Sequence, residues 1–244
     1  MKNILTFNVE KDGLMRAQIE MVLEFLDETG SAATFFINGV EAEKNPNIVR
    51  LIHGNGHEIA SHGYEGTPVY RQTPGEFVAD IRKSIVLLED ITGEYLYGYR
   101  APGWTITERS GWALPYLKRN GFLYDASFFP QKHTGYGIAK GPRLPCFINI
   151  TRGGKERILE VPPSSMSVMD YRFVFSSRFL RGCPELVLRF QIGGIYSTGN
   201  PVICFLEPHE LDLCRGIVKA YLMREPMTTI KDFFTEKGFL NDDV

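Results

Sequence analysis

The chain has 244 residues, of which 43% are hydrophobic and 23% charged, and its formal net charge is −2. These values are typical of a globular protein, and the lack of a basic excess argues against nucleic-acid binding. The four cysteines form no CxxC pair, so the sequence contains no zinc-ribbon motif and suggests a reducing compartment. We expect one domain over residues 1–244, because α/β barrels of this length commonly form a single domain.

The N-terminal sequence MKNILTFNVE gives an expectation about location. Asn8 and Glu10 end its apolar run before it reaches the length of a signal peptide. No other run approaches the ~20 apolar residues that span a bilayer. We therefore expect a cytoplasmic protein with no membrane span.

Short apolar runs alternate along the chain with segments whose apolar residues recur every three to four positions. The first pattern predicts strands and the second predicts helices. Thr73 and Glu76 form a capping-box sequence at the start of the clearest helix. The expected strands cover residues 4–9, 33–37, 57–61, 95–100, 122–125, 158–163 and 201–208. The expected helices cover residues 14–29, 46–54, 74–92, 107–119 and 228–237.

This alternation implies a parallel sheet with right-handed crossovers. About seven strands over this length favour a barrel, so we predict an α/β fold, a distorted (β/α) barrel of about seven parallel strands. Residues 131–157 are rich in Gly and Pro and predict a long functional loop. The apolar stretch 173–205 is either core or a dimer face, which leaves a homo-oligomer open.

In parallel barrels, functional residues lie at the C-terminal ends of the strands. Asn8 and Glu10 are two residues apart after the first strand, so they point to the same side. Glu10 is either a ligand of a divalent metal or a solvated turn residue. His62 follows the third strand in a glycine-flanked loop, as a metal ligand or as a structural residue.

The polar residues that follow the later expected strands also have both a functional and a structural interpretation. Arg100 could orient a carboxylate, or it could form a buried pair with Asp125. Trp104 could form a wall of a sugar site. His133 is either a substrate contact or an exposed loop residue. Glu207, at the end of the last strand, could donate or accept a proton or bind a metal.

Together these motifs resemble the NodB-homology polysaccharide deacetylases, a group of carbohydrate esterases, and in particular the branch with Asp-Val-Glu-Asp and SHGYDH motifs. Here the first motif is Asn8-Val9-Glu10-Lys11, and the second is Ser61-His62-Gly63-Tyr64-Glu65-Gly66. The segments YGYRAPGWTIT, GFLYDASFFP, YGI and LEVPPS also match, so the resemblance covers residues 3–240.

The resemblance implies metal-assisted hydrolysis of an N-acyl group on an amino sugar. In the family, one acidic residue and two histidines hold a divalent metal, often zinc, which activates a water molecule. An aspartate in the first motif is the general base, and a late histidine protonates the leaving amine. Glu10 and His62 match the metal ligands, while Arg100, Trp104 and Asp125 match supporting positions.

Three positions depart from the family pattern. Asn8 stands at the base position, Gly66 at the second metal histidine and Glu207 at the late histidine. Glu207, Glu65 or His209 could supply the third ligand, and Glu207 could instead replace the base. We therefore predict metal ligands Glu10, His62 and Glu207, catalytic residues Glu207, Asp125 and Arg100, and substrate contacts Trp104, His133, Tyr136 and Asn8.

Two functions remain open. The first is a hydrolase of amide bonds with a rebuilt site for a divalent metal, expected to be zinc, which acts on an amino-sugar glycan or on a sugar-nucleotide intermediate. The second is an inactive homologue that binds a sugar or a partner through the same cleft. Three changed chemical positions favour the second function, and the intact supporting residues favour the first.

Overall fold

The computed structural model describes residues 2–10, 16–131, 133, 135–138, 140–151, 153–168 and 171–240. Its main sheet contains β1 (Ile4–Val9), β2 (Thr34–Ile37), β3 (Glu58–Ser61), β4 (Gly98–Tyr99), β5 (Tyr124–Asp125), β6 (Cys146–Asn149), β7 (Arg157–Glu160) and β10 (Ile203–Leu206). The strand order is β10-β1-β2-β3-β4-β5-β7-β6. Every neighbouring pair is parallel except β6 and β7. The seven predicted parallel strands are therefore confirmed.

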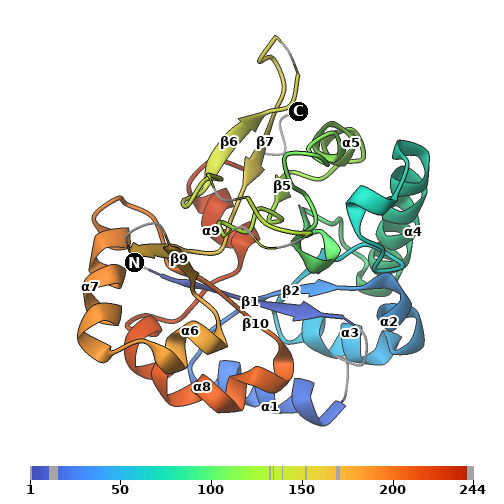
Figure 1. Cartoon of the computed structure of the whole chain (residues 1–244). Coiled ribbons are helices and arrows are strands. Elements are labelled where there is room, and N and C mark those ends of the chain that lie inside the picture. Colours follow the sequence, from blue (N-terminus) through green and yellow to red (C-terminus); the bar gives the residue numbers. More distant parts are fainter. Residues whose placement is uncertain are drawn as a thin grey trace.

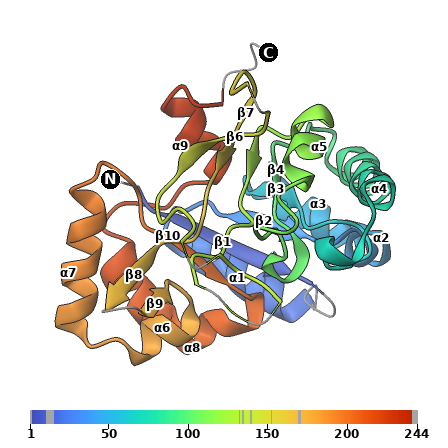
Figure 2. The same ribbon diagram turned by 45° about the horizontal axis from the view of Figure 1, so that its top comes forward.

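Helices surround this curled sheet (Figures 1 and 2). The α-helices are α1 (Arg16–Glu28), α2 (Gly39–Lys44), α3 (Pro46–Gly54), α4 (Pro74–Thr92), α5 (Ala113–Arg119), α6 (Ser177–Gly182), α7 (Glu185–Tyr196), α8 (Leu211–Ile217) and α9 (Ile230–Glu236). Short 3₁₀ turns cover Val69–Arg71, Pro102–Trp104 and Pro208–Glu210, and a π-helical turn covers Val218–Leu222. No helix in the described ranges combines the length and apolarity that a bilayer crossing requires.

Two regions differ from the sequence expectation. The predicted loop 131–157 contains β6, which pairs with β7. The ambiguous stretch 173–205 forms the end of a hairpin of β8 (Ser165–Val168) and β9 (Tyr171–Val174), followed by α6 and α7 and the start of β10. Both buried and exposed positions of α7 are apolar, so the periodicity of this stretch could not distinguish these elements.

A buried layer of apolar side chains fills the inside of the curled sheet. Phe36, Tyr124 and Ile203 from the strands pack in one cluster with Ile230 and Phe234 of α9. The backbone N–H of Ile230 donates to Thr34 Oγ1 at 2.9 Å, at the start of β2. The helix α9 therefore covers the N-terminal ends of the strands, and the C-terminal ends remain for a functional site.

The sheet is a half-barrel whose open side is bridged by the segment after β7. The N–H of Ser164 donates to the carbonyl of Ile203 at 2.9 Å, and the N–H of Ile203 donates to Ser164 Oγ at 2.9 Å. The preceding residues, Pro162 and Pro163, have no N–H to donate, so a regular ladder cannot continue here. Ser164 therefore links β10 to the segment after β7 across the open side of the half-barrel.

Candidate active site

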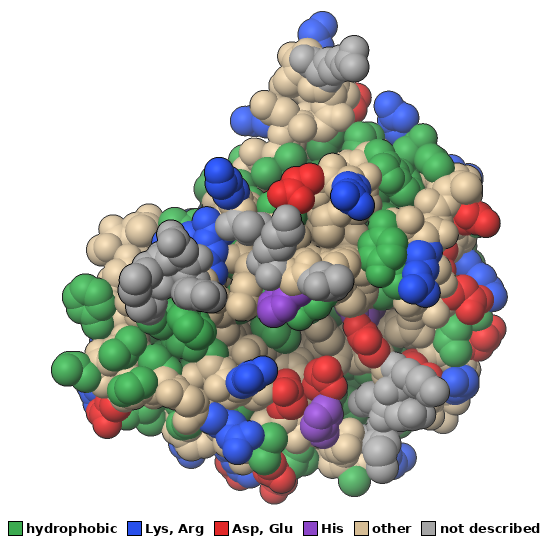
Figure 3. Space-filling model, viewed as in Figure 1, with side chains coloured by type: hydrophobic (Ala, Val, Ile, Leu, Met, Phe, Trp, Pro, Cys, Tyr) green, Lys and Arg blue, Asp and Glu red, His purple; other side chains and the backbone are tan. Residues whose placement is uncertain are grey.

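The register of the sheet aligns the ends of its parallel strands. Val9 pairs with Ile37, Ile37 with Ser61, Ser61 with Tyr99, and Tyr99 with Asp125. The residues that follow this row, among them Glu10, His62 and Arg100, therefore gather at one rim. Figure 3 shows a hollow near the middle of this face, with acidic and histidine side chains around it.

Glu10 and His62 contact each other directly. His62 Nε2 lies 2.7 Å from Glu10 Oε1, and His62 Nδ1 lies 2.7 Å from the carbonyl oxygen of Arg100. A carbonyl only accepts, so Nδ1 must carry a proton, and the short contact of Nε2 with the carboxylate needs a second proton between those atoms. The hydrogen bond from His62 is the main cause that lowers the pKa of Glu10.

The orientation of His62 is the one found in many metal sites, where one ring nitrogen is held by a carbonyl and the other faces the metal. A catalytic zinc site, however, generally uses three protein ligands. Within the described residues, no group of three His, Cys, Asp or Glu side chains could hold a metal ion. The residues present therefore do not fit the metal site that the resemblance implies.

Gly66 explains part of this misfit. Its φ is +74°, and a Cβ atom added there would lie 3.3 Å from Asn38 Nδ2. The Asn38 side chain caps α2, because its Oδ1 accepts the N–H groups of Val40 and Glu41. Gly66 stands where the family pattern has a histidine. The space next to Gly66 is bordered by the side-chain amide of Asn38, which is already used to cap α2.

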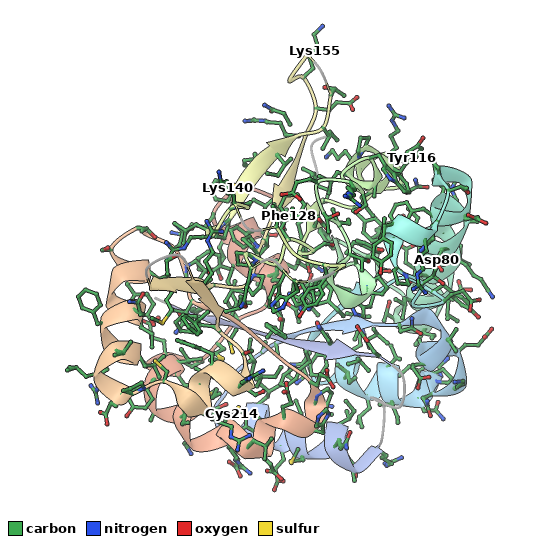
Figure 4. All side chains as sticks on the ribbon, in the orientation of Figure 1. Asp80, Tyr116, Phe128, Lys140, Lys155 and Cys214 are labelled. Carbon is green, nitrogen blue, oxygen red and sulfur yellow. The ribbon has the colours of Figure 1, made fainter. Side chains whose placement is uncertain are left out.

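The loop that carries His62 has a support that the sequence did not reveal. Asp80 on α4 accepts the N–H groups of Tyr64 and Glu65 at 2.8 and 2.9 Å (Figure 4). The two carboxylate oxygens therefore fix the backbone directly after His62. Asp80 lies on a helix face with ordinary amphipathic spacing, so no local sequence signal indicated this role.

The predicted third ligand, Glu207, is not assembled with Glu10 and His62. The N–H of Glu210 donates to the backbone carbonyl of Glu207 at 2.9 Å, and the N–H of Glu207 donates to the Glu210 carboxylate at 2.9 Å. The Glu207 carboxylate lies 3.4 Å from His209 Nδ1. The Glu10, His62 and Glu207 ligand set is therefore not assembled among the described residues, and Glu207 as a metal ligand stays a prediction. Burial and the charge of Glu210 raise the pKa of Glu207.

Arg100 is fully buried and has partners other than the predicted one. Its Nη1 donates to Asn8 Oδ1 at 2.7 Å and to Thr6 Oγ1 at 3.0 Å, and its Nε donates to the carbonyl of Ala126 at 3.1 Å. Among the described residues, no carboxylate forms an ion pair with it, and its Nη2 has no hydrogen-bond partner. Burial lowers the pKa of Arg100 to about 9. The expected Arg100–Asp125 pair is replaced by an amide contact with Asn8.

Asp125 belongs to a different buried network. It accepts from Ser127 Oγ at 2.5 Å, and Ser127 Oγ accepts the N–H of Ala101 at 2.8 Å. Burial raises the pKa of Asp125 to about 6 and raises that of the neighbouring Glu160 well above its usual range. Asp125 is 0% exposed, and through Ser127 it positions the loop after β4, so its predicted catalytic role stays a prediction.

Glu160 was not singled out in the sequence, although it is an acidic residue inside an apolar strand. It is fully buried at the end of β7, and its Oε1 accepts the N–H of Phe128 at 3.0 Å. Glu160 and Asp125 pair in register on neighbouring strands. Two adjacent buried carboxyl groups cannot both ionise readily, so we infer that they share a proton.

Trp104 was expected to form a wall of a sugar site, but only 7% of it is exposed. Its ring lies 4.5 Å from the Arg100 guanidinium and packs against Phe129 and Phe205, with centroid distances of 5.2 and 5.0 Å. Its φ is +58°, which is uncommon for a residue with a side chain and is typical of strained functional loops. The indole therefore packs beneath the surface of the cleft and holds neighbouring side chains in place.

His133 and Tyr136 lie on the rim of the cleft. Their rings stack with centroids 4.5 Å apart, and Phe129 lies 5.7 Å from Tyr136. Both side chains are partly exposed, so their predicted contact with a substrate stays a prediction. Lys11, in the first motif, lies outside the described residues.

Comparisons with known proteins agree with this arrangement. Residues 3–123 match the sequence model of the polysaccharide deacetylase family, and residues 126–231 match a domain of unknown function. A peptidoglycan deacetylase-like protein of Gibberella zeae is 35% identical over 114 residues, which cover 46% of this chain and 33% of that protein. A peptidoglycan deacetylase of Helicobacter pylori is 30% identical over 123 residues, which cover 50% of this chain and 41% of that protein. The match thus spans less than half the length of either relative.

Solved structures share the whole fold. A Mycobacterium smegmatis protein assigned to the polysaccharide deacetylases has a TM-score of 0.71 and 19% identity, over 97% of this chain and 90% of that one. A carbohydrate esterase family 4 pseudoenzyme of Bacillus anthracis has a TM-score of 0.57 and 13% identity, over 95% and 65%. A mutant of that pseudoenzyme has restored enzymatic activity. The chain therefore contains a NodB-type polysaccharide deacetylase domain, which belongs to a family of hydrolases that act on amide bonds.

Proposed function

We propose that this chain binds an N-acylated amino-sugar glycan at the C-terminal rim of its sheet, without the metal-dependent hydrolysis that the resemblance implies. One observation carries the proposal. Within the described residues, no third His, Cys, Asp or Glu side chain joins Glu10 and His62 in a group that could hold a metal ion, and Gly66 has no side chain to offer at the position of the second metal histidine. In addition, Asn8 at the base position offers its oxygen to Arg100 and cannot accept a proton at ordinary pH.

The rim retains groups that suit a sugar. Glu10 and Glu207 have side chains 52% and 58% exposed, and carboxylates accept hydrogen bonds from hydroxyl and N-acyl groups. The partly exposed ring of Tyr136 provides an apolar surface with a polar tip beside them. The names of the curated relatives, which include a peptidoglycan deacetylase and a peptidoglycan-N-acetylglucosamine deacetylase, support a peptidoglycan-like glycan that contains N-acetylglucosamine.

Calorimetric titration with chitotetraose tests the proposal. We expect binding that is independent of added zinc, and we expect no release of acetate during prolonged incubation. Tyr136→Ala should weaken the affinity about tenfold through lost ring contact. The matched variant Tyr95→Ala, at a position that is 83% exposed and lies outside the rim, should leave it unchanged. Stoichiometric zinc together with acetate release would refute the proposal.

A second candidate is metal-free hydrolysis with Glu207 as the acid or base. The carboxylate of Glu207 is 58% exposed and lies 3.4 Å from His209, and burial together with the charge of Glu210 raises its pKa, whereas the pKa of Glu10 is lowered. Carboxylates whose pKa values are pushed apart are a common arrangement for acid–base chemistry.

Glu207→Gln separates the two candidates. We expect the variant to bind chitotetraose with nearly the affinity of the parent protein, since an amide keeps one acceptor oxygen, and we expect neither protein to release acetate. If the parent protein releases acetate and Glu207→Gln reduces the rate by about 100-fold or more, hydrolysis through Glu207 is the function.

A further inference from the structure

An apolar groove begins beside the aromatic rim and runs between the β8–β9 hairpin and the helices α6 and α7. Its volume is about 690 Å³, and its apolar lining includes Phe129, Met166, Phe173, Phe179, Pro184 and Val187. His133 and Tyr136 also line the groove. Because these two residues also form the rim of the cleft, a molecule that leaves the cleft on this side enters the groove.

Apolar surface continues from the groove onto α7. Phe173 is 44% exposed and Val187 is 37% exposed inside the groove, and Leu186 and Phe190 on α7 are 80% and 77% exposed. Figure 3 shows hydrophobic side chains gathered over this part of the molecule, on the left of the view. Contiguous exposed apolar surface of this kind commonly marks a binding site.

Positive charge accompanies the apolar lining. Arg178 lines the groove itself. Arg172 and Arg143 do not line it: Arg172 Nη1 donates to the carbonyls of Pro130 and Gly141, and Arg143 Nη2 donates to the carbonyl of Ser165. The described part of the chain contains no acidic side chain in an ion pair with any of these arginines. The groove thus combines a hydrocarbon-like lining with the guanidinium of Arg178, which no described carboxylate neutralises.

We propose that this groove binds the hydrocarbon chain of a lipid-phosphate-linked glycan, with the phosphate near Arg178 and the sugar in the cleft. The polar cleft, Arg178 and the apolar groove match the sugar, the anion and the chain of one amphiphilic molecule. A hydrocarbon chain gains free energy from each methylene group that leaves water, and guanidinium groups bind phosphate strongly. The position of the sugar rests on the proposed function, whereas the groove can be tested by itself.

Calorimetry with three soluble probes tests the groove, each below its micelle-forming concentration. Decyl phosphate should bind at least about tenfold more tightly than butyl phosphate, because only the longer chain fills the groove. It should also bind more tightly than decyltrimethylammonium, which has the same chain and the opposite charge. Equal affinities for the two chain lengths, or a preference for the cation, would overturn the inference.

Variants locate the site. Val187→Glu should weaken decyl phosphate binding about tenfold or more, since it places a carboxylate in the apolar lining. Arg178→Gln should weaken it by about threefold to tenfold. Leu213→Glu is the matched control, because Leu213 is 53% exposed on α8 and does not line the groove. If Leu213→Glu has the same effect as Val187→Glu, the chain does not bind in this groove.

Two further measurements address other occupants and the cleft. If light scattering shows a dimer that Val187→Glu dissociates, a second copy occupies the groove and the inference fails. It also fails if the protein binds anionic vesicles but no monomeric decyl phosphate. Val187→Glu should leave chitotetraose affinity unchanged. Decyl phosphate binding without chitotetraose binding refutes the proposed function and supports the groove, and the reverse result refutes the groove alone.

Discussion

The combined substitution Asn8→Asp, Gly66→His and Glu207→His is expected to create a zinc site and measurable release of acetate from chitotetraose. The change supplies the base, the second metal histidine and the late histidine that the resemblance implies. Zinc affinity should rise by several orders of magnitude, because two protein ligands become three. Calorimetric titration with zinc and an acetate assay measure the two gains separately.

The backbone at Gly66 makes the new histidine the costly part of this change. Its φ of +74° is unfavourable for a side chain, so we expect a loss of about 1 kcal/mol in the free energy of unfolding. The single variants Asn8→Asp and Glu207→His would not share this strain, whereas Gly66→Ala shares it and adds no ligand. Gly66→Ala is therefore the matched control, and a triple variant that is folded yet binds no zinc would contradict the proposed loss of the metal site.

Arg100→Ala is expected to lower the free energy of unfolding by about 4 kcal/mol. The substitution removes a fully buried side chain that stacks 3.8 Å over the ring of Phe36. It also leaves the carbonyl of Ala126 and the amide of Asn8 without their donor. Urea unfolding followed by circular dichroism measures the change, and a loss below about 1 kcal/mol would contradict the role assigned to Arg100.

Asn8→Asp provides the complementary test of this buried cation. A carboxylate beside the guanidinium should raise stability by about 1 kcal/mol, because the Arg100 charge otherwise lacks an ion-pair partner. In an Arg100→Met background the same substitution should be destabilising, since it buries an unpaired carboxylate. A double-mutant cycle of the four proteins measures the coupling, and a coupling near zero would show that residue 8 does not sense the charge.

The sequence predicted the sheet and the position of the rim well. Largely apolar runs such as residues 4–9 and 201–208 are too short for a typical helix and contain β-branched and aromatic residues, which together favour a buried strand. The ends of such strands meet at one edge, so Glu10 and His62 were expected together and are in contact. Their separation of 52 residues had no bearing on the prediction, because only the strand order matters.

Side-chain partners could not be predicted in the same way. The partner of Arg100 depends on the register of β1 against β4, which are separated by two strands, and on rotamers that a sequence does not show. Trp104 has a positive φ, and neither Trp104 nor the residues before it signal this backbone conformation in the sequence. Its inward orientation therefore could not be predicted. The Glu207 carboxylate lies 3.4 Å from His209 of the same turn, and a local side-chain contact of this kind also leaves no sign in the sequence.

The strand order has a consequence for shortened forms of this protein. The strands β1 to β4 come from the segment that matches the deacetylase family, and β10 and β5–β7 lie on either side of them. A fragment of residues 3–123 would expose two unpaired parallel edges, at β1 and at β4. Such edges recruit strands from other molecules, so the fragment should aggregate when expressed alone. The C-terminal half thus acts as a cover for both open edges of the half that carries the family match.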